Sequence, residues 1–202
     1  MQKTAEPSEL SEPSEPKTRN DFLKYSGELT LDLNTAHPRL ELSAANRKAT
    51  FTFHKKDYHS HLNWFPFWTP SLRGRHYWEV EWTGGAVYIA VAYKNVGTSQ
   101  FGSDDKSWAL YCGKNSYIFY HKPVQTHVPG PGSSRVGVYL DHRAGVLEFY
   151  SLSAETMTLL HRVQTTFTQP ITPFKGKSVF KAGMQPFQPL FSGTNEQTSH
   201  QL

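Results

Sequence analysis

The stretch RHYWEVEW, residues 75–82, decides the fold class of this protein. Trp78, Val80 and Trp82 alternate with more polar residues, which is the period-two pattern of a β-strand with one apolar face. The segments SWALYCGKNSYIFYH (residues 107–121) and RVGVYLDHRAGVLEFYSL (residues 135–152) have the same chemistry, each with turn residues in its middle. Repeated hairpins rich in Trp, Tyr and Val predict an all-β fold, an antiparallel β-sandwich of two packed sheets.

The rest of the chain extends this pattern. We expect strands at residues 29–31, 40–42, 49–53, 76–82, 87–93, 108–112, 117–121, 136–141, 146–151 and 157–163. Only one short helical turn is expected, near residues 21–25. Residues 54–63, 94–107 and 125–134 are expected to be loops, the last because of its Pro129-Gly130-Pro131-Gly132 run. Because a sandwich carries function on its connections, these loops are where binding residues are sought.

Composition limits the class of protein. The chain has 202 residues, five Trp, ten Tyr and thirteen Phe, which are enough for one domain with a sizeable core. Its formal charge of +4 comes from scattered Lys and Arg residues, so no nucleic-acid partner is expected. No apolar run is long enough to span a membrane. The single cysteine, Cys112, excludes an internal disulfide and favours a reducing, cytoplasmic location.

The two ends of the chain differ from its body. Residues 1–20 are rich in Ser, Glu and Pro and are expected to form a disordered leader or linker. Residues 192–202 are polar and are expected to form a disordered tail. The folded domain is therefore expected over residues 21–191, with order beginning near Asp21–Tyr25.

Several segments together resemble the B30.2 domain, the PRY–SPRY pair of tripartite-motif proteins and butyrophilins. LTLDLNTAHPRLELSAANRKATF (residues 29–51) resembles the PRY part. RHYWEVEW, DKSWAL (residues 105–110) and RVGVYLDHRAGVLEFYS resemble the three SPRY signature blocks. The resemblance implies a PRY part over about residues 21–68 and a SPRY part over about residues 69–191.

In its details the sequence is most similar to fish B30.2 domains of tripartite-motif-16-like proteins and of stonefish-type toxin subunits. The strand VYIAV departs from the family, because Val87 and Ala90 stand in its usual Trp and Gly places. After Pro170, ITPFKGKSVFKAGMQPF replaces the family's final apolar strand. We therefore expect this last strand to be missing or altered, which would expose a sheet edge and favour aggregation.

Neither an enzyme nor a metal site is favoured by the residues. His54, His59 and His61, with Asp57, have zinc-ligand chemistry, but their spacing matches no structural zinc motif. The run from Gly97 to Gly102 is not a nucleophile elbow, and no nucleophile–base set is found. We expect no cofactor and no catalytic activity. Ubiquitin-ligase activity would require a RING domain in a longer product.

Recognition is the remaining function. The resemblance implies protein binding through loops, and the loops supply aromatic side chains beside charged ones, as binding hot spots do. The expected partner-binding residues are Lys55, Tyr58, His59, Lys94, Asn95, Asp105, Tyr117, Tyr120 and His121.

Three settings stay open for this recognition function. The first is a protein-binding module in innate immune or tripartite-motif ubiquitin signalling. The second is the C-terminal domain of a secreted, pore-forming toxin subunit. The third is a sensor of phosphorylated small ligands, as the resemblance to butyrophilins implies. This last setting is disfavoured because Arg residues are not clustered.

Overall fold

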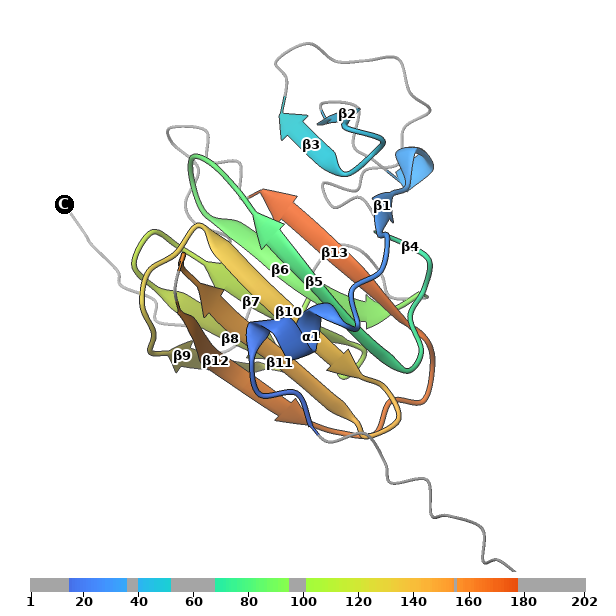
Figure 1. Cartoon of the computed structure of the whole chain (residues 1–202), viewed down its shortest axis with the longest axis vertical. Helices are drawn as coiled ribbons and strands as arrows, with labels where there is room; N and C mark the ends of the chain where they lie inside the picture. Colours follow the sequence, from blue (N-terminus) through green and yellow to red (C-terminus); the bar gives the residue numbers. More distant parts are fainter. Residues whose placement is uncertain (1–14, 36–39, 52–67, 95–100, 155, 178–202) are drawn as a thin grey trace, which may run out of the picture.

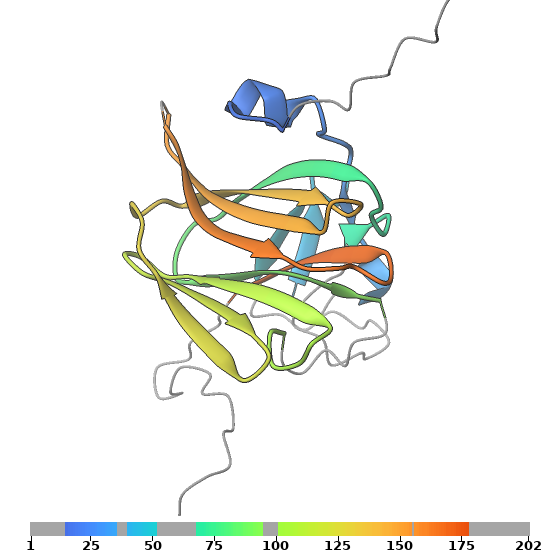
Figure 2. The same ribbon diagram turned by 90° about the horizontal axis from the view of Figure 1, so that it is seen from below.

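Two antiparallel sheets packed face to face form the body of the protein (Figures 1 and 2). The computed structural model describes residues 15–35, 40–51, 68–94, 101–154 and 156–177. The four-stranded sheet has the order β12 (Met157–Gln164), β11 (Val146–Leu152), β10 (Arg135–Asp141), β5 (Arg75–Glu81). The five-stranded sheet has the order β13 (Ile171–Lys177), β6 (Val87–Tyr93), β7 (Ser107–Cys112), β8 (Tyr117–His121), β9 (Val124–Val128). The predicted fold class is confirmed.

Smaller elements lie beside the sandwich. The strand β1 (Thr30–Leu31) pairs with β4 (Trp68–Thr69), and β2 (Leu40–Ser43) pairs with β3 (Lys48–Phe51). A 3-10 turn, η1 (Leu33–Thr35), follows β1. The one α-helix of the described residues, α1 (Arg19–Leu23), begins two residues before the expected start of order.

The core lies between the two sheets, as the alternation predicts. Val138 of β10 is opposite Trp78 on β5 and Phe149 on β11, and the three side chains are at most 7% exposed. From the other sheet, Trp108 and Leu110 of β7 complete the same cluster. All the expected core residues are buried: Trp78, Val80, Trp82, Trp108, Leu110, Val138, Leu140 and Phe149.

Turn chemistry fixes the β10–β11 hairpin. Gly145 has a φ of +72°, and a Cβ there would lie 1.7 Å from the carbonyl oxygen of Thr165. Only glycine combines this left-handed conformation with such a close approach. The register that follows pairs Asp141 with Val146 and Leu140 with Leu147, which directs both leucines into the core.

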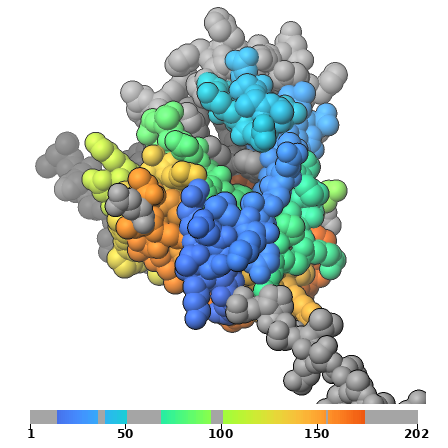
Figure 3. Space-filling model, in the orientation of Figure 1, coloured from blue at the N-terminus to red at the C-terminus, as the bar shows by residue number. Residues whose placement is uncertain are grey.

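The helix α1 covers the outer face of the four-stranded sheet (Figures 2 and 3). Thr18 and Asp21 form a capping box, in which Thr18 Oγ1 accepts from the Asp21 N–H and the Asp21 carboxylate accepts from the Thr18 N–H. This cap starts a helix too short to be stable alone. Burial of Phe22, which is 2% exposed, holds the helix on the sheet.

The strand β9 lies where the sequence did not predict a strand. Residues 124–128 form β9, although a loop was expected from residue 125 onward. The apolar signal of this strand is weak because only Val128 of its five residues is buried. Pairing with β8 therefore decides the structure here, overriding the nearby Pro and Gly residues.

The expectation of a missing final strand is wrong for residues 171–177, and residues 178–187 of the divergent segment lie outside the described residues. Residues 171–177 form β13, which pairs with β6 in a regular antiparallel register from Ile171–Tyr93 to Lys177–Val87. Ile171 and Phe174 are 0% and 3% exposed, so the divergent sequence still supplies the apolar contacts. Pro173 is tolerated because β13 ends the sheet, where one side of the strand needs no ladder hydrogen bonds.

Candidate protein-binding surface

The outer face of the four-stranded sheet is occupied by the chain itself. The ring of Phe22 lies 5.5 Å from that of Tyr77, 5.0 Å from that of Tyr139 and 5.1 Å from that of Tyr150, measured between centroids. Burial by this contact raises the pKa of Tyr139 to about 12. The backbone N–H of Tyr77 also donates to the carbonyl of Tyr25 at 3.0 Å. The middle of this face is therefore closed to other ligands.

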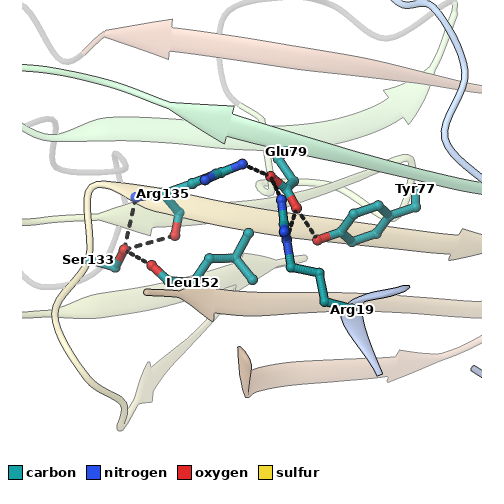
Figure 4. Close-up of polar contacts among 6 residues, drawn as sticks. All are labelled: Arg19, Tyr77, Glu79, Ser133, Arg135 and Leu152. Carbon is teal, nitrogen blue, oxygen red and sulfur yellow. Dashed lines mark hydrogen bonds and ion pairs between the residues drawn. The ribbon is translucent and has the colours of Figure 1, made fainter. Parts of the chain in front are cut away.

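Charged side chains on the same face are paired internally (Figure 4). Arg19 Nε donates to Glu79 Oε1 at 2.7 Å, and Arg19 Nη2 donates to Glu79 Oε2 at 3.0 Å. The Tyr77 hydroxyl and Arg135 donate to the same carboxylate. Burial raises the pKa of Glu79, but the hydrogen bonds from Arg19 and Tyr77 and the charge of Arg135 outweigh it, so the net shift is downward.

Two more ion pairs lie on this face of the four-stranded sheet. Arg75 Nε donates to Asp141 Oδ2 at 2.7 Å, and Arg162 Nη1 donates to Glu148 Oε1 at 2.8 Å. Both carboxylates are under 10% exposed, and a buried charge of this kind needs such a partner. The charges of this sheet therefore stabilise the fold.

The outer face of the five-stranded sheet is different, because it displays tyrosines. Tyr88 of β6, Tyr111 of β7 and Tyr120 of β8 form what we call the tyrosine patch. Their ring centroids are 5.2 Å apart for Tyr88–Tyr111 and 6.1 Å for Tyr88–Tyr120. All three side chains are half-buried. Burial raises the pKa of Tyr88 and of Tyr120; the neighbouring tyrosines add to the shift of Tyr88, whereas the hydrogen bond with Tyr88 partly offsets that of Tyr120, and both stay neutral hydroxyls at physiological pH.

A fixed loop, residues 101–106, borders the tyrosine patch. Gly102 has a φ of +84°, and a Cβ there would lie 2.5 Å from the Cβ of Tyr120, so the loop passes directly against the patch. The Gly102 N–H donates to Ser107 Oγ at 2.7 Å, and this hydroxyl donates to Asp104 Oδ1 at 2.8 Å. The loop is thereby held in place and presents Asp105, which is exposed.

A pocket lies next to the same loop. Its volume is about 270 Å³, and its lining residues are Asp32, Thr69, Pro70, Ser71, Lys94, Thr172 and Phe174. The hydroxyls of Ser71 and Thr172 are 2.9 Å apart and hydrogen-bonded. Phe174 also packs against Phe101, with ring centroids 4.3 Å apart. Because Phe174 both lines the pocket and packs against Phe101 of the loop, the pocket and the loop adjoin. Tyrosine patch, loop and pocket together form the candidate binding surface.

The structure places three of the predicted site residues on this surface. Lys94 lines the pocket, Asp105 lies on the loop and Tyr120 belongs to the tyrosine patch. The predicted Lys55, Tyr58, His59 and Asn95 lie outside the described residues, as do His54, Asp57 and His61 of the weighed metal cluster.

Two predicted site residues face inward instead. Tyr117 is 1% exposed, and its hydroxyl donates to the Pro131 carbonyl at 3.0 Å. His121 stacks on Trp108 with ring centroids 5.0 Å apart, and its Nδ1 lies 2.9 Å from the Ser107 carbonyl oxygen. Both lie in β8 on the side opposite Tyr120, so their side chains point toward the other sheet and help to support the sandwich.

Sequence reasoning missed Tyr88, Tyr111, Phe101 and Phe174. A signal was available for the two tyrosines. In VYIAVAY and SWALYC, Tyr88 and Tyr111 alternate with apolar residues that enter the core, so both must point outward. Nothing in the sequence indicated that Phe101 and Phe174, far apart in the chain, pack together.

Neither a metal-binding cluster nor a reactive thiol is found among the described residues. Among them, no three His, Cys, Asp or Glu side chains lie close enough together to bind a metal ion. Cys112 is 0% exposed, and burial raises the pKa of its thiol, which makes the thiol unreactive. No helix within the described ranges is both long and apolar enough to cross a membrane.

Comparison with known proteins agrees with the two-sheet fold. The SPRY domain model matches residues 75–196, and the model of the SPRY-associated domain, PRY, matches residues 29–71. The chain therefore belongs to the SPRY-domain family, in its PRY–SPRY or B30.2 form. Domains of this family are binding domains rather than catalytic ones.

Individual relatives fall into two groups. Stonustoxin subunit alpha of Synanceia horrida is 37% identical over 78% of this chain and 24% of its own length. Tripartite motif-containing protein 16 of Mus musculus is 29% identical over 78% of this chain and 31% of its own length. This chain thus spans about a quarter to a third of these relatives.

Solved structures give the same two groups. The TRIM65 PSpry domain superposes with a TM-score of 0.73 over 81% of this chain and 94% of its own, at 24% identity, which shows the fold alone. The stonustoxin structure gives a TM-score of 0.72 at 33% identity, over 82% of this chain and 29% of its own.

Proposed function

We propose that this chain binds a partner protein through the tyrosine patch, the loop of residues 101–106 and the adjoining pocket. One observation carries the proposal. Of the two outer faces of the sandwich, one is filled by Phe22 and by internal ion pairs, whereas the other displays half-buried tyrosines beside an exposed acid and an exposed lysine. Tyrosine is enriched at binding hot spots because it combines a large apolar ring with a hydrogen-bonding hydroxyl.

Each part of the surface has its own role in this proposal. Tyr88, Tyr111 and Tyr120 provide a rigid apolar centre, because their rings pack on one another before any partner arrives. Asp105 and Lys94 lie beyond that centre, where charges set specificity and association rate more than affinity. The pocket is large enough for one side chain of the partner.

The setting that we propose is the cytoplasm, in innate immune or tripartite-motif ubiquitin signalling. The similarity to tripartite motif-containing protein 16 and to the mouse ligase TRIM25 supports it. In that setting the chain itself transfers no ubiquitin. It selects the target, and a RING domain in a longer product would supply the ligase activity.

The alternative is the recognition domain of a secreted, pore-forming toxin subunit. It is favoured by the 37% and 38% identity to the two stonustoxin subunits. Sequencing the full-length transcript upstream of Met1 separates the two settings. RING, B-box and coiled-coil sequence supports the first, and a toxin body supports the second.

A sensor of phosphorylated small ligands fits the site less well. Among the described residues that line the pocket, Lys94 is the one cation, and Asp32 adds a negative charge to the same lining. Phosphate-binding sites normally contain several positively charged side chains that donate hydrogen bonds.

Quantitative capture from cell lysate tests the binding surface. The bait is the full chain, compared with Tyr111→Ala/Tyr120→Ala, with Asp105→Arg and with a control, Leu159→Ala. Leu159 is 48% exposed on β12, in the other sheet. We expect the double variant to lose specific partners by about thirtyfold, which corresponds to ~2 kcal/mol. Asp105→Arg should weaken capture without affecting the fold, and the control should retain it. Equal capture by all four baits at equal thermal stability would contradict this site.

A further inference from the structure

The strand β9 is an open edge of the five-stranded sheet. It pairs with β8 on one side, and no strand of the described residues pairs with its other side. Residues 124–127 are all exposed, and Val124, at 59%, is the most exposed large apolar side chain of the described chain. An edge of this kind is a template for pairing with another strand.

The hairpin geometry shows which backbone groups of β9 are available. The turn between β8 and β9 has two residues, Lys122 and Pro123, closed by the pair His121–Val124. The closing pair of a two-residue hairpin is hydrogen-bonded, and hydrogen-bonded pairs then alternate along the ladder. Val124, Thr126 and Val128 therefore bond to β8, whereas the N–H and C=O groups of Gln125 and His127 point outward.

This edge lacks the usual protection within the strand. The sequence VQTHV contains no Pro, Gly, Lys or bulge, which are the devices that normally block edge pairing. By contrast β12, one of the two edges of the other sheet, carries Arg162, which pairs with Glu148 and with Glu15. Pro123 and Pro129 flank β9 on either side, so pairing is limited to these five residues.

The strand sequence is symmetric about Thr126. If two copies of VQTHV run antiparallel about this residue, Thr126 meets Thr126, Gln125 meets His127 and Val124 meets Val128. Thr–Thr and Val–Val pairs stabilise cross-strand contacts, Gln and His can hydrogen-bond, and no like charges meet. Few registers of an arbitrary strand would give complementary pairs at every position.

We propose that β9 pairs with β9 of a second copy of this chain, to form a twofold-symmetric dimer with a sheet continuous across both copies. Gln125 and His127 of each copy exchange backbone hydrogen bonds with His127 and Gln125 of the other, giving about four in total. The contact is self-complementary, so it closes at two copies and does not form filaments. A single five-residue strand buries little surface, so the dimer is weak. Any other link between the two copies would raise their effective concentration and so strengthen the pairing.

Sedimentation of the full chain from about 1 µM to 1 mM tests the dimer. We expect reversible, concentration-dependent dimers in the wild type. Thr126→Lys and Thr126→Glu each place like charges face to face and should weaken self-association at least tenfold, a loss of about 1.4 kcal/mol. Mixing equal amounts of the two variants places Lys opposite Glu and should restore association. A strictly monomeric wild type, or a dimer that both variants leave unchanged, would overturn the proposal.

Cysteine crosslinking tests the register. Thr126→Cys should form a disulfide-linked dimer on mild oxidation, because directly opposite Cα atoms in an antiparallel pair lie within disulfide reach. The matched control is Gln125→Cys, whose direct neighbour in this register is His127 rather than itself. The native Cys112 is fully buried and does not interfere. Equal crosslinking of the two variants would contradict the register.

The dimer and the partner site are separable in these experiments. Thr126 shares the inward side of β9 with Val128, whereas the tyrosine patch is on the outer face. Thr126→Lys should therefore weaken self-association at least tenfold and leave partner capture intact.

Discussion

Arg19 and Glu79, sixty residues apart in the chain, form a two-point ion pair with N–O distances of 2.7 Å and 3.0 Å. This pair, together with Phe22, fastens the segment preceding the PRY part onto the SPRY sheet (Figure 4). Arg19 is 42% exposed, so the ion pair alone contributes only modestly, whereas the buried ring of Phe22 contributes most of the docking free energy.

Phe22→Ala should destabilise the protein by about 3 kcal/mol, because it leaves a cavity among three tyrosine rings. Leu23→Ala is the matched control, since this neighbour in α1 is 36% exposed and should change stability by less than about 0.5 kcal/mol. Urea unfolding of both variants measures the difference. Equal stabilities would show that α1 does not stabilise the sheet.

Acid should weaken the Glu79 network. The pKa of Glu79 is below its ordinary 4.5 in the folded protein, so the folded state binds fewer protons than the unfolded state near that pH. Its stabilising contribution is therefore present above pH 4.5 and is lost as the pH falls through the folded pKa. Glu79→Gln should be less stable than wild type at pH 7, with the gap narrowing toward pH 3. Glu28→Gln, at an exposed position, should show no such narrowing in thermal unfolding.

His161 should give a second pH dependence, at higher pH. Its ring lies 4.0 Å from that of Phe119, and burial lowers the pKa of His161 from its ordinary 6.5. The unfolded chain therefore takes up the proton first, so stability falls as the pH drops below 6.5. Replacing His161 with Gln should flatten the stability profile between pH 7 and pH 5, whereas His127→Gln, at an exposed site, should not. A profile unchanged by His161→Gln would refute this assignment.

The last strand should be essential to stability. Ile171→Ala and Phe174→Ala each remove a buried side chain of β13 and should cost about 2–5 kcal/mol in free energy of unfolding. Gln169→Ala, at an exposed position just before the strand, serves as the control and should be nearly neutral. If the first two variants were also neutral in chemical denaturation, the packing of β13 would not stabilise the fold.

Strands with strong alternation were predictable from the sequence. Residues 87–93 and 117–121 form β6 and β8 with the predicted bounds, because every second side chain enters the core. The strands β9 and β13 were not predictable in this way. The side chains of residues 124–127 are exposed, and β13 contains Pro173 and Gly176, so their pairing partners decide their conformation.

The candidate site was only partly predictable, for a related reason. Tyr117, Tyr120 and His121 are equivalent in the sequence as polar aromatic residues of one short segment. The register of β8 directs Tyr120 outward, while Tyr117 and His121 face the core. Because side chains alternate between the two faces, a shift of one residue in the inferred pattern would place each of these side chains on the opposite face.

The sequence by itself determined the fold class and, in the strongly alternating strands, which side chains share a face, because alternation follows from strand geometry alone. Tyr77 and Tyr88 both point outward from their sheets by this rule. Only the tertiary structure decided that Tyr77 is 1% exposed beneath Phe22, whereas Tyr88 remains partly exposed in the tyrosine patch. The reason is that burial depends on which face a distant segment covers, and here α1 packs on the four-stranded sheet.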